Sequence, residues 1–176
     1  GIRSILRHDP DIVMIGEIRD LDTAMAACQA ALTGHVLLST LHTNSATEAI
    51  PRLLTIGVPP FVIAPSLHTV IAQRLVRRMC AACSKDRKIT EKERKIFAET
   101  LETLKAMNLN GHAAIPETVK GVKGCDECNH TGYRGQLVIS EVLIAEGVIQ
   151  EAILGGASVK KIFELARAQG MLTMRE

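Results

Sequence analysis

Aromatic residues are scarce in this sequence. Of its 176 residues none is tryptophan, one is tyrosine and three are phenylalanine. Proteins that bind single-stranded nucleic acid stack bases on aromatic side chains, and few are available for that purpose here. The net charge of +2 is too small to indicate a polyanionic partner by itself. We therefore expect no nucleic-acid partner.

Long hydrophobic runs are also absent. No stretch approaches the roughly 18 consecutive apolar residues of a membrane span, and no secretory signal peptide opens the chain. We therefore expect no direct insertion into a membrane. The first residue is Gly1 rather than methionine, so we expect the chain to be a piece of a longer protein.

The order of predicted elements indicates an α/β fold. Short apolar runs predict buried strands at 12–15 and 36–41, and the Ala-rich segment between them predicts a helix over 21–32. This order is typical of a mostly parallel sheet with both faces covered. The remaining predictions are helices at 2–8, 45–54, 61–72, 90–107, 148–154 and 159–168, strands at 74–79 and 137–139, and a loop over 112–124. Capping boxes predict the helix starts near Ser45 and Thr90, each with a glutamate three residues later.

Charged residues follow the first predicted strand. Glu17 stands at its carboxyl end, where open α/β sheets bind ligands, and Arg19 and Asp20 follow in the same loop. A carboxylate in that place can orient or deprotonate water, or hold the water shell of Mg²⁺. A strand that ends in a solvated charge cluster is an alternative interpretation of the same residues.

Two histidines bracket the second predicted strand. His35 precedes it, and His42 follows it beside Thr43 and Asn44. Such a polar group can contact a γ-phosphate and transmit its loss to the fold. Taken singly, a histidine is more often structural than catalytic. The gathering of polar residues at the ends of two strands favours a functional site.

Four of the five cysteines form two CxxC pairs, Cys80 with Cys83 and Cys125 with Cys128. Two intervening residues let both thiolates of a turn face one tetrahedral ion, and two such turns complete a closed shell, which predicts a structural zinc. The alternatives are a redox pair, disulfides, four unligated thiols, or His130 in place of one cysteine. The fifth, Cys28, lies in an apolar predicted helix and is expected to be buried and inert.

Taken together, these stretches resemble the type II secretion and type IV pilus assembly ATPase family. The similarity extends over nearly the whole chain. The matching stretches are Leu6–Asp20, Thr33–Asn44, Gln73–Arg78, Gly132–Gly135 and Gly170–Arg175.

The resemblance implies the C-terminal part of a RecA-like P-loop ATPase domain with a four-cysteine zinc-binding insertion and C-terminal helices. The implied regions are an ATPase core over 1–79, a zinc-binding subdomain over 80–133, and a C-terminal strand and helices over 134–176. Glu17 corresponds to the Walker B glutamate, and His35 and His42 to the histidine pair. The nucleotide-binding arginines would be Arg3, Arg7, Arg19 and Arg52, since guanidinium groups suit phosphate oxygens.

The resemblance also implies a motor. It would be a cytoplasmic homo-hexamer at the bacterial inner membrane that hydrolyses ATP with Mg²⁺. Its partners would be an inner-membrane platform protein and the cytoplasmic domain of a membrane-anchored secretion or pilus component. The four cysteines favour the assembly or secretion branch over pilus retraction. The alternatives are a zinc-ribbon module that binds nucleic acid and a protein-interaction module.

Two departures from the family pattern matter. No Gly-x-x-x-x-Gly-Lys-Ser/Thr occurs in the chain, so the amides and lysine that cradle the β- and γ-phosphates are missing. We therefore predict that this chain alone does not hydrolyse ATP. Gln136 stands where family members often carry arginine, so no nucleotide contact is assigned to it.

Overall fold

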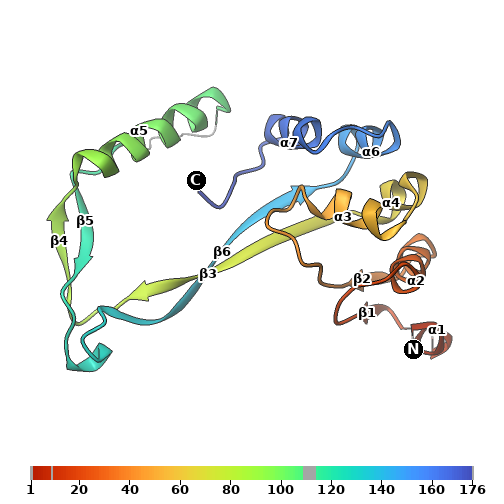
Figure 1. Cartoon of the computed structure of the whole chain (residues 1–176), viewed down its shortest axis with the longest axis horizontal. Helices are drawn as coiled ribbons and strands as arrows, with labels where there is room; N and C mark the ends of the chain where they lie inside the picture. Colours follow the sequence, from red (N-terminus) through yellow and green to blue (C-terminus); the bar gives the residue numbers. More distant parts are fainter. Residues whose placement is uncertain (1, 9, 109–113, 176) are drawn as a thin grey trace. The chain divides into compact units, whose positions relative to one another are not determined.

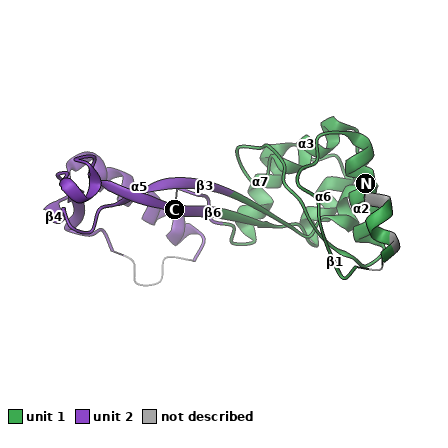
Figure 2. Ribbon diagram, turned by 90° about the horizontal axis from the view of Figure 1, so that it is seen from below, with its two compact units in different colours: residues 1–72, 141–171 green, residues 73–140, 172–176 purple. Residues whose placement is uncertain are grey.

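The computed structural model describes residues 2–8, 10–108 and 114–175, without the side chains of Ile2, Arg3 and Arg7. By their internal contacts the residues divide into two compact units (Figure 2). The first comprises residues 1–72 and 141–171, and the second comprises 73–140 and 172–176. The predicted third region, 134–176, is therefore shared between the two units. Within the described residues, no helix has the length and apolar character needed to cross a membrane.

A two-stranded parallel sheet with a connecting helix organises the first unit (Figure 1). Strand β1 (Ile12–Met14) pairs with β2 (Val36–Leu38), with Ile12 opposite Val36. Helix α2 (Leu21–Leu32) begins where predicted, because the Asp20 carboxylate accepts a hydrogen bond from the Thr23 N–H at 2.8 Å. The helix ends before Gly34, whose φ of 97° favours glycine. The parallel strand–helix–strand order confirms the predicted α/β class.

One face of this sheet is exposed, which corrects the prediction that both faces are buried. Val13 is 3% exposed, whereas the residues on the opposite side of the strands are more than half exposed: Ile12, Met14, Val36 and Leu38. Successive side chains of a strand point to opposite faces, so an apolar run indicates that both faces need covering. The run does not indicate that the covering layer lies within these 176 residues.

The first unit contains further helices besides α2. They are α1 (Ile2–Ile5) with a 3-10 turn (Leu6–His8), α3 (Ala49–Ile56), α4 (Pro60–Ser66), α6 (Val148–Leu154) and α7 (Val159–Ala168). Helix α4 packs on α2 and α6, and α6 packs on α7. The largest fully buried side chains of this core include Ile50, Ile63, Leu143, Ile149, Ile153 and Ile162.

The predicted capping box at Ser45 is wrong. Helix α3 begins only at Ala49, and no side chain caps it. The Glu48 carboxylate accepts instead from the Asn44 N–H at 2.9 Å, and the Ser45 hydroxyl lies 3.3 Å from the Thr47 hydroxyl. These side chains thus stabilise the loop before the helix rather than the helix itself. The sequence motif does not distinguish the two uses of the same donors and acceptors.

The second unit is built from long and short strand pairs. Strand β3 (Thr69–Met79) pairs with β6 (Tyr133–Ile144), and β4 (Ser84–Lys88) pairs antiparallel with β5 (Thr118–Val122). The ends of β3 and β6 that lie within 73–140 belong to this unit. The sequence predicted helix rather than strand over 69–72 and loop rather than β5, and it did not predict β4. Charged residues have low strand propensity, so the pairing of β4 with β5 decides the structure here.

Helix α5 (Glu91–Ala106) starts with the predicted capping box. The Thr90 hydroxyl accepts from the Glu93 N–H at 3.3 Å, and the Glu93 carboxylate accepts from the Thr90 N–H at 2.8 Å. We expect Thr90→Ala to lower the free energy of unfolding by about 1 kcal/mol, because it removes the acceptor of the Glu93 N–H in the first turn. Denaturant unfolding measures the effect, with Thr103→Ala in the same helix as the control. Equal stability of the two variants would contradict this role of Thr90.

Candidate functional site

Glu17 and His42 meet where β1 and β2 end. The Ile18 N–H donates to the Thr40 carbonyl at 3.1 Å, and the Thr40 hydroxyl donates to the Gly16 carbonyl at 2.7 Å. These bonds hold the segments that follow the two strands side by side. His42 Nε2 consequently lies 3.6 Å from Glu17 Oε1. The two residues singled out at different strand ends therefore share one edge of the sheet.

Arg19 holds the Glu17 carboxylate with a two-pronged ion pair. Its Nε donates to Glu17 Oε1 and its Nη2 donates to Oε2, the latter at 2.7 Å. The hydrogen bond from Arg19 lowers the pKa of Glu17 against an opposing effect of desolvation, and the charges of Arg19 and His42 add to the lowering. Glu17 therefore stays ionised at neutral pH. An ionised carboxylate at this edge can orient a water molecule or hold the water shell of Mg²⁺.

His35 lies at the other end of β2. The ring Nδ1 of His35 is 3.1 Å from the Thr33 hydroxyl and 3.2 Å from the Ala30 carbonyl. The backbone N–H of His35 donates to the same carbonyl at 3.2 Å. His35 thus contacts the last turn of α2 and precedes the strand that His42 follows. The structure does not bring it to Glu17, so its place in a histidine pair rests on the family resemblance.

The predicted nucleotide-binding arginines have different surroundings. Arg19 is paired with Glu17, and Arg52 is exposed on α3. The side chains of Arg3 and Arg7 lie outside the described part of the chain. Arg19 and Arg52 are the two whose side chains are described, and of these Arg19 contacts another predicted site residue.

Two acidic residues that hold the segment carrying His42 were not predicted from the sequence. Glu48 accepts from the Asn44 N–H, and Glu141 accepts from the Ala46 N–H at 2.7 Å. Glu141 is only 6% exposed although it is charged. A single acid within the apolar stretch 137–145 is a signal in the sequence, since strands bury charges only with a partner. The partner, a backbone amide 95 residues away, leaves no trace in the sequence.

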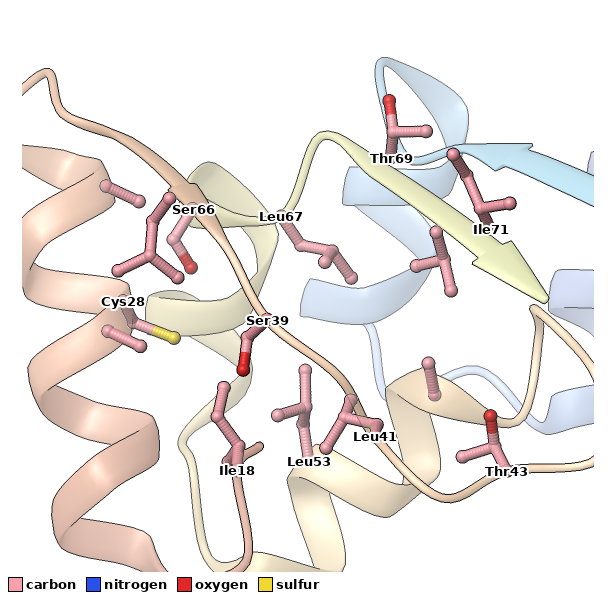
Figure 3. A pocket seen from close by; sticks show the side chains of 15 residues that line it. Ile18, Cys28, Ser39, Leu41, Thr43, Leu53, Ser66, Leu67, Thr69 and Ile71 are labelled. Atoms are coloured by element: carbon pink, nitrogen blue, oxygen red, sulfur yellow. The ribbon is translucent and has the colours of Figure 1, made fainter. Parts of the chain in front are cut away.

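A mostly apolar cavity of about 190 Å³ lies beside the histidine segment (Figure 3). Ile18 and Thr43, neighbours in sequence of Glu17 and His42, contribute to its wall, as does Leu53 of α3. Cys28 also lines this cavity and is half-buried, whereas the sequence predicted full burial. The described lining has serine and threonine hydroxyls but no charged side chain, so we assign no phosphate contact to this cavity.

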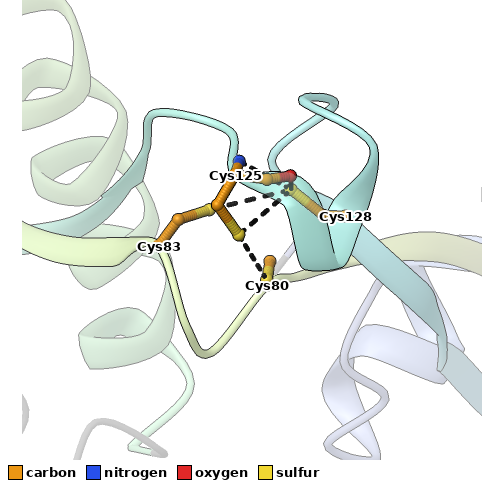
Figure 4. A group of neighbouring side chains, drawn as sticks. All are labelled: Cys80, Cys83, Cys125 and Cys128. Carbon is orange, nitrogen blue, oxygen red and sulfur yellow. Dashed lines mark hydrogen bonds between the residues drawn. The ribbon is translucent and has the colours of Figure 1, made fainter.

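The four paired cysteines converge in the second unit (Figure 4). Their Sγ atoms all lie within 4.8 Å of one another. The distance is 3.9 Å for Cys80–Cys125 and Cys83–Cys128, and 3.8 Å for Cys125–Cys128. Disulfide sulfurs are about 2.05 Å apart, whereas sulfurs 2.3 Å from a tetrahedral zinc ion are separated by about 3.8 Å. The cluster therefore fits a tetrahedral metal ion and contains no disulfide.

The turns around the cysteines hold the sulfurs in place. The Cys80 N–H donates to the Gly132 carbonyl at 2.9 Å. Burial raises the pKa of Cys128, but N–H groups of Cys125 and Gly132, each 3.2 Å from its sulfur, lower it. Together with the neighbouring thiols of Cys125 and Cys83 they outweigh burial and bring the pKa of Cys128 to about 6. His130 stands outside the cluster and lies 3.2 Å from the Asp126 carboxylate. A thiolate stabilised by two amides is the usual state of a metal-bound cysteine.

Comparison with known proteins gives consistent matches. The family model described as type II/IV secretion system protein matches residues 1–176. The type II secretion system protein E of Aeromonas hydrophila is 46% identical over 167 residues, which is 95% of this chain and 31% of the relative. The type IV pilus assembly ATPase PilB of Thermus thermophilus is 46% identical over 176 residues, 100% of this chain and 19% of the relative. The chain thus spans less than a third of either relative.

A solved structure has the same fold. The pilus retraction motor PilT with bound ADP matches with a TM-score of 0.58 and covers 98% of this chain and 40% of that chain. The two sequences are 23% identical, so this likeness shows the fold alone. It supports the α/β class predicted from the sequence. The family model and the two relatives carry the assignment further: the chain belongs to the type II/IV secretion system protein family.

Proposed function

We propose that this chain is the C-terminal part of a hexameric ATPase that powers type II secretion or type IV pilus assembly. The observation that carries the proposal is the 3.6 Å approach of His42 Nε2 to Glu17 Oε1 at one sheet edge. The relatives span far more than the matched residues, and one of them is named an ATPase. In this proposal the phosphate-binding loop lies in sequence upstream of Gly1.

The proposed roles follow from the chemistry of each group. Glu17, kept ionised by Arg19, holds the water shell of Mg²⁺ and orients the attacking water. His42 contacts the γ-phosphate and changes its contact when that phosphate leaves. Arg19 and the exposed Arg52 meet phosphate oxygens, in part across a subunit boundary. Family resemblance alone assigns the same role to Arg3 and Arg7, and a place in the histidine pair to His35.

The proposed cellular setting is the cytoplasmic side of the bacterial inner membrane. The partners in this proposal are other copies of the chain, an inner-membrane platform protein, and the cytoplasmic domain of a membrane-anchored component. The names of the relatives, which belong to secretion and pilus assembly systems, support it. The same relatives do not favour the alternative of a zinc-ribbon module that binds nucleic acid.

The four-cysteine cluster is proposed to hold a structural zinc ion. Four thiolates close the tetrahedral shell and leave no position for a substrate, so the ion would stabilise the fold rather than take part in the reaction. Cys80, Cys83, Cys125 and Cys128 would be its ligands. The sulfur separations of 3.8–3.9 Å support this assignment.

ATP turnover tests whether the active site needs residues outside this 176-residue chain. With Mg²⁺ and ATP, we expect the full-length protein to release phosphate and this 176-residue chain to release none above a protein-free blank. The reason is that the chain has no amides and lysine to hold the β- and γ-phosphates. Phosphate release measured for both proteins, at equal concentration and with zinc present, decides the question. Turnover by the short chain would show that the residues for catalysis are complete within it.

A further inference from the structure

The segment that carries His42 has no regular structure of its own. Between the end of β2 and the start of α3, residues 39–48 form neither helix nor strand. No ladder of backbone hydrogen bonds fixes its path, so individual contacts must do so. The position of His42 and Thr43 therefore depends on where those contacts attach the segment.

Among the described contacts of this segment, three sets bear on where its two ends lie. Thr40 is bonded to Gly16 and Ile18 near the end of β1. Farther on, the Asn44 N–H donates to the Glu48 carboxylate, a contact within the segment itself. The third attachment comes from a different part of the fold, because the Ala46 N–H donates to Glu141 Oε1 on β6 at 2.7 Å. It ties the far end of the segment to the core of the first unit.

The Glu141 attachment is buried. Ala46 is 0% exposed, and Glu141 is 6% exposed. At the end of β6 buried residues alternate with exposed ones: Leu143, and Ala145 just after the strand, are both 0% exposed. The Ala145 N–H also donates to the His68 carbonyl at 2.8 Å. A buried carboxylate that accepts an N–H makes a strong bond, and water does not readily replace it.

We propose that Glu141 is a positioning residue for the γ-phosphate contact: by holding the Ala46 N–H it sets where His42 and Thr43 stand. Glu141 acts through the segment and does not itself touch the nucleotide. The proposal rests on the proposed function for its effect on turnover. Its structural half, the anchoring of Ala46, stands independently of that function.

Three substitutions in the full-length protein distinguish an effect of where the Glu141 acceptor oxygen lies from an effect of its charge. Glu141→Ala removes the acceptor, and Glu141→Asp draws it back by about 1.5 Å, the length of one carbon–carbon bond. Glu141→Gln keeps an acceptor oxygen at the same reach and removes the charge. We expect the first two to raise amide hydrogen exchange at Ala46 about 10- to 100-fold without nucleotide, and Glu141→Gln to leave it near the wild-type rate.

The variants that raise exchange at Ala46 should also be the ones that lower ATP turnover. Glu141→Ala and Glu141→Asp are expected to lower kcat about 10- to 100-fold, since a misplacement of about 1 Å at a reacting group costs on the order of 100-fold. The Kd for ADP should stay within about twofold, because ADP lacks the γ-phosphate. Glu141→Gln should retain wild-type kcat. Leu143→Ala, two residues along the same strand, is the control: it lowers stability but leaves kcat at the wild-type value.

The anchoring of Ala46 by Glu141 and its effect on ATP turnover would be refuted by different results. Unchanged exchange at Ala46 in Glu141→Ala would show that Glu141 does not anchor Ala46, whether or not ATP turnover changes. Faster exchange with unchanged kcat would refute its role in turnover. Loss of kcat in Glu141→Gln with Ala46 still protected would show that charge acts rather than position, and the proposal would be wrong. A wild-type protein without ATP turnover would refute the proposed function, while exchange at Ala46 would still decide the anchor.

Discussion

Protein purified without added zinc should contain one zinc ion per chain, and Cys125→Ser should contain almost none. Three of the sulfur–sulfur distances, 3.8–3.9 Å, already match a tetrahedral zinc shell, and all four sulfurs lie within 4.8 Å of one another. A serine hydroxyl is a poor zinc ligand, so the variant keeps only three good ones. Since the metal-binding free energy of such a site is also folding free energy, we expect the second unit to lose structure with the metal.

Elemental analysis and amide hydrogen exchange measure the two effects. Exchange should rise in β4 and β5, which are adjacent in sequence to the cysteine turns, and change little in α6 of the first unit. Cys28→Ser is the matched control, because it makes the same chemical change at a cysteine outside the cluster. His130→Ala should also retain zinc, since His130 pairs with Asp126.

A different result would favour one of the alternatives for the cysteines. If the wild-type protein contains no metal and its mass shows the loss of four hydrogens, the cysteines form two disulfides. If it contains no metal and all five thiols react with a thiol reagent, the cluster is unligated. Either finding would remove the structural role assigned to Cys80, Cys83, Cys125 and Cys128.

Local chemistry explains which parts of the fold the sequence predicts well. Helix α2 has its bounds as predicted because Asp20 caps one end and Gly34 follows the other. The meeting of Glu17 and His42 was predictable as well, since parallel strands bring their carboxyl ends to one edge. These features depend on residues within a few positions or on the strand direction alone.

Long-range pairing explains what the sequence does not show. Strand β4 is charged and exists because β5, some thirty residues later, pairs with it. The Ser45 motif has the side chains of a capping box but uses them in a loop. Glu141 stands out as an acid in an apolar strand, yet only the folded chain shows that its partner is the Ala46 N–H. Contacts of this kind have no periodicity or spacing to reveal them.

Glu17→Gln in the full-length protein should lower kcat about 100- to 10,000-fold, the range typical of a lost general base. Glutamine keeps the size of the side chain, but its neutral amide cannot take a proton. It also lacks the negative charge with which the carboxylate would hold the Mg²⁺ water shell. Binding of ATP should persist, because the phosphate-binding loop supplies most of the contacts to the phosphates. Phosphate release and the Kd of a fluorescent ATP analogue measure the two quantities separately. Asp22→Asn, the same chemical change at an exposed carboxylate on α2, is the control.

The pH dependence of the same reaction tests the role of Arg19. The hydrogen bond from Arg19 lowers the pKa of Glu17, so the ionised form persists as the pH falls through the usual glutamate range. Activity should therefore decline on the acid side only below the unperturbed value of about 4.3. In Arg19→Ala the pKa of Glu17 rises, and the acid limb of kcat moves to higher pH. Loss of a phosphate contact by Arg19 alone would raise KM and leave that limb in place, which would contradict the assigned effect on Glu17.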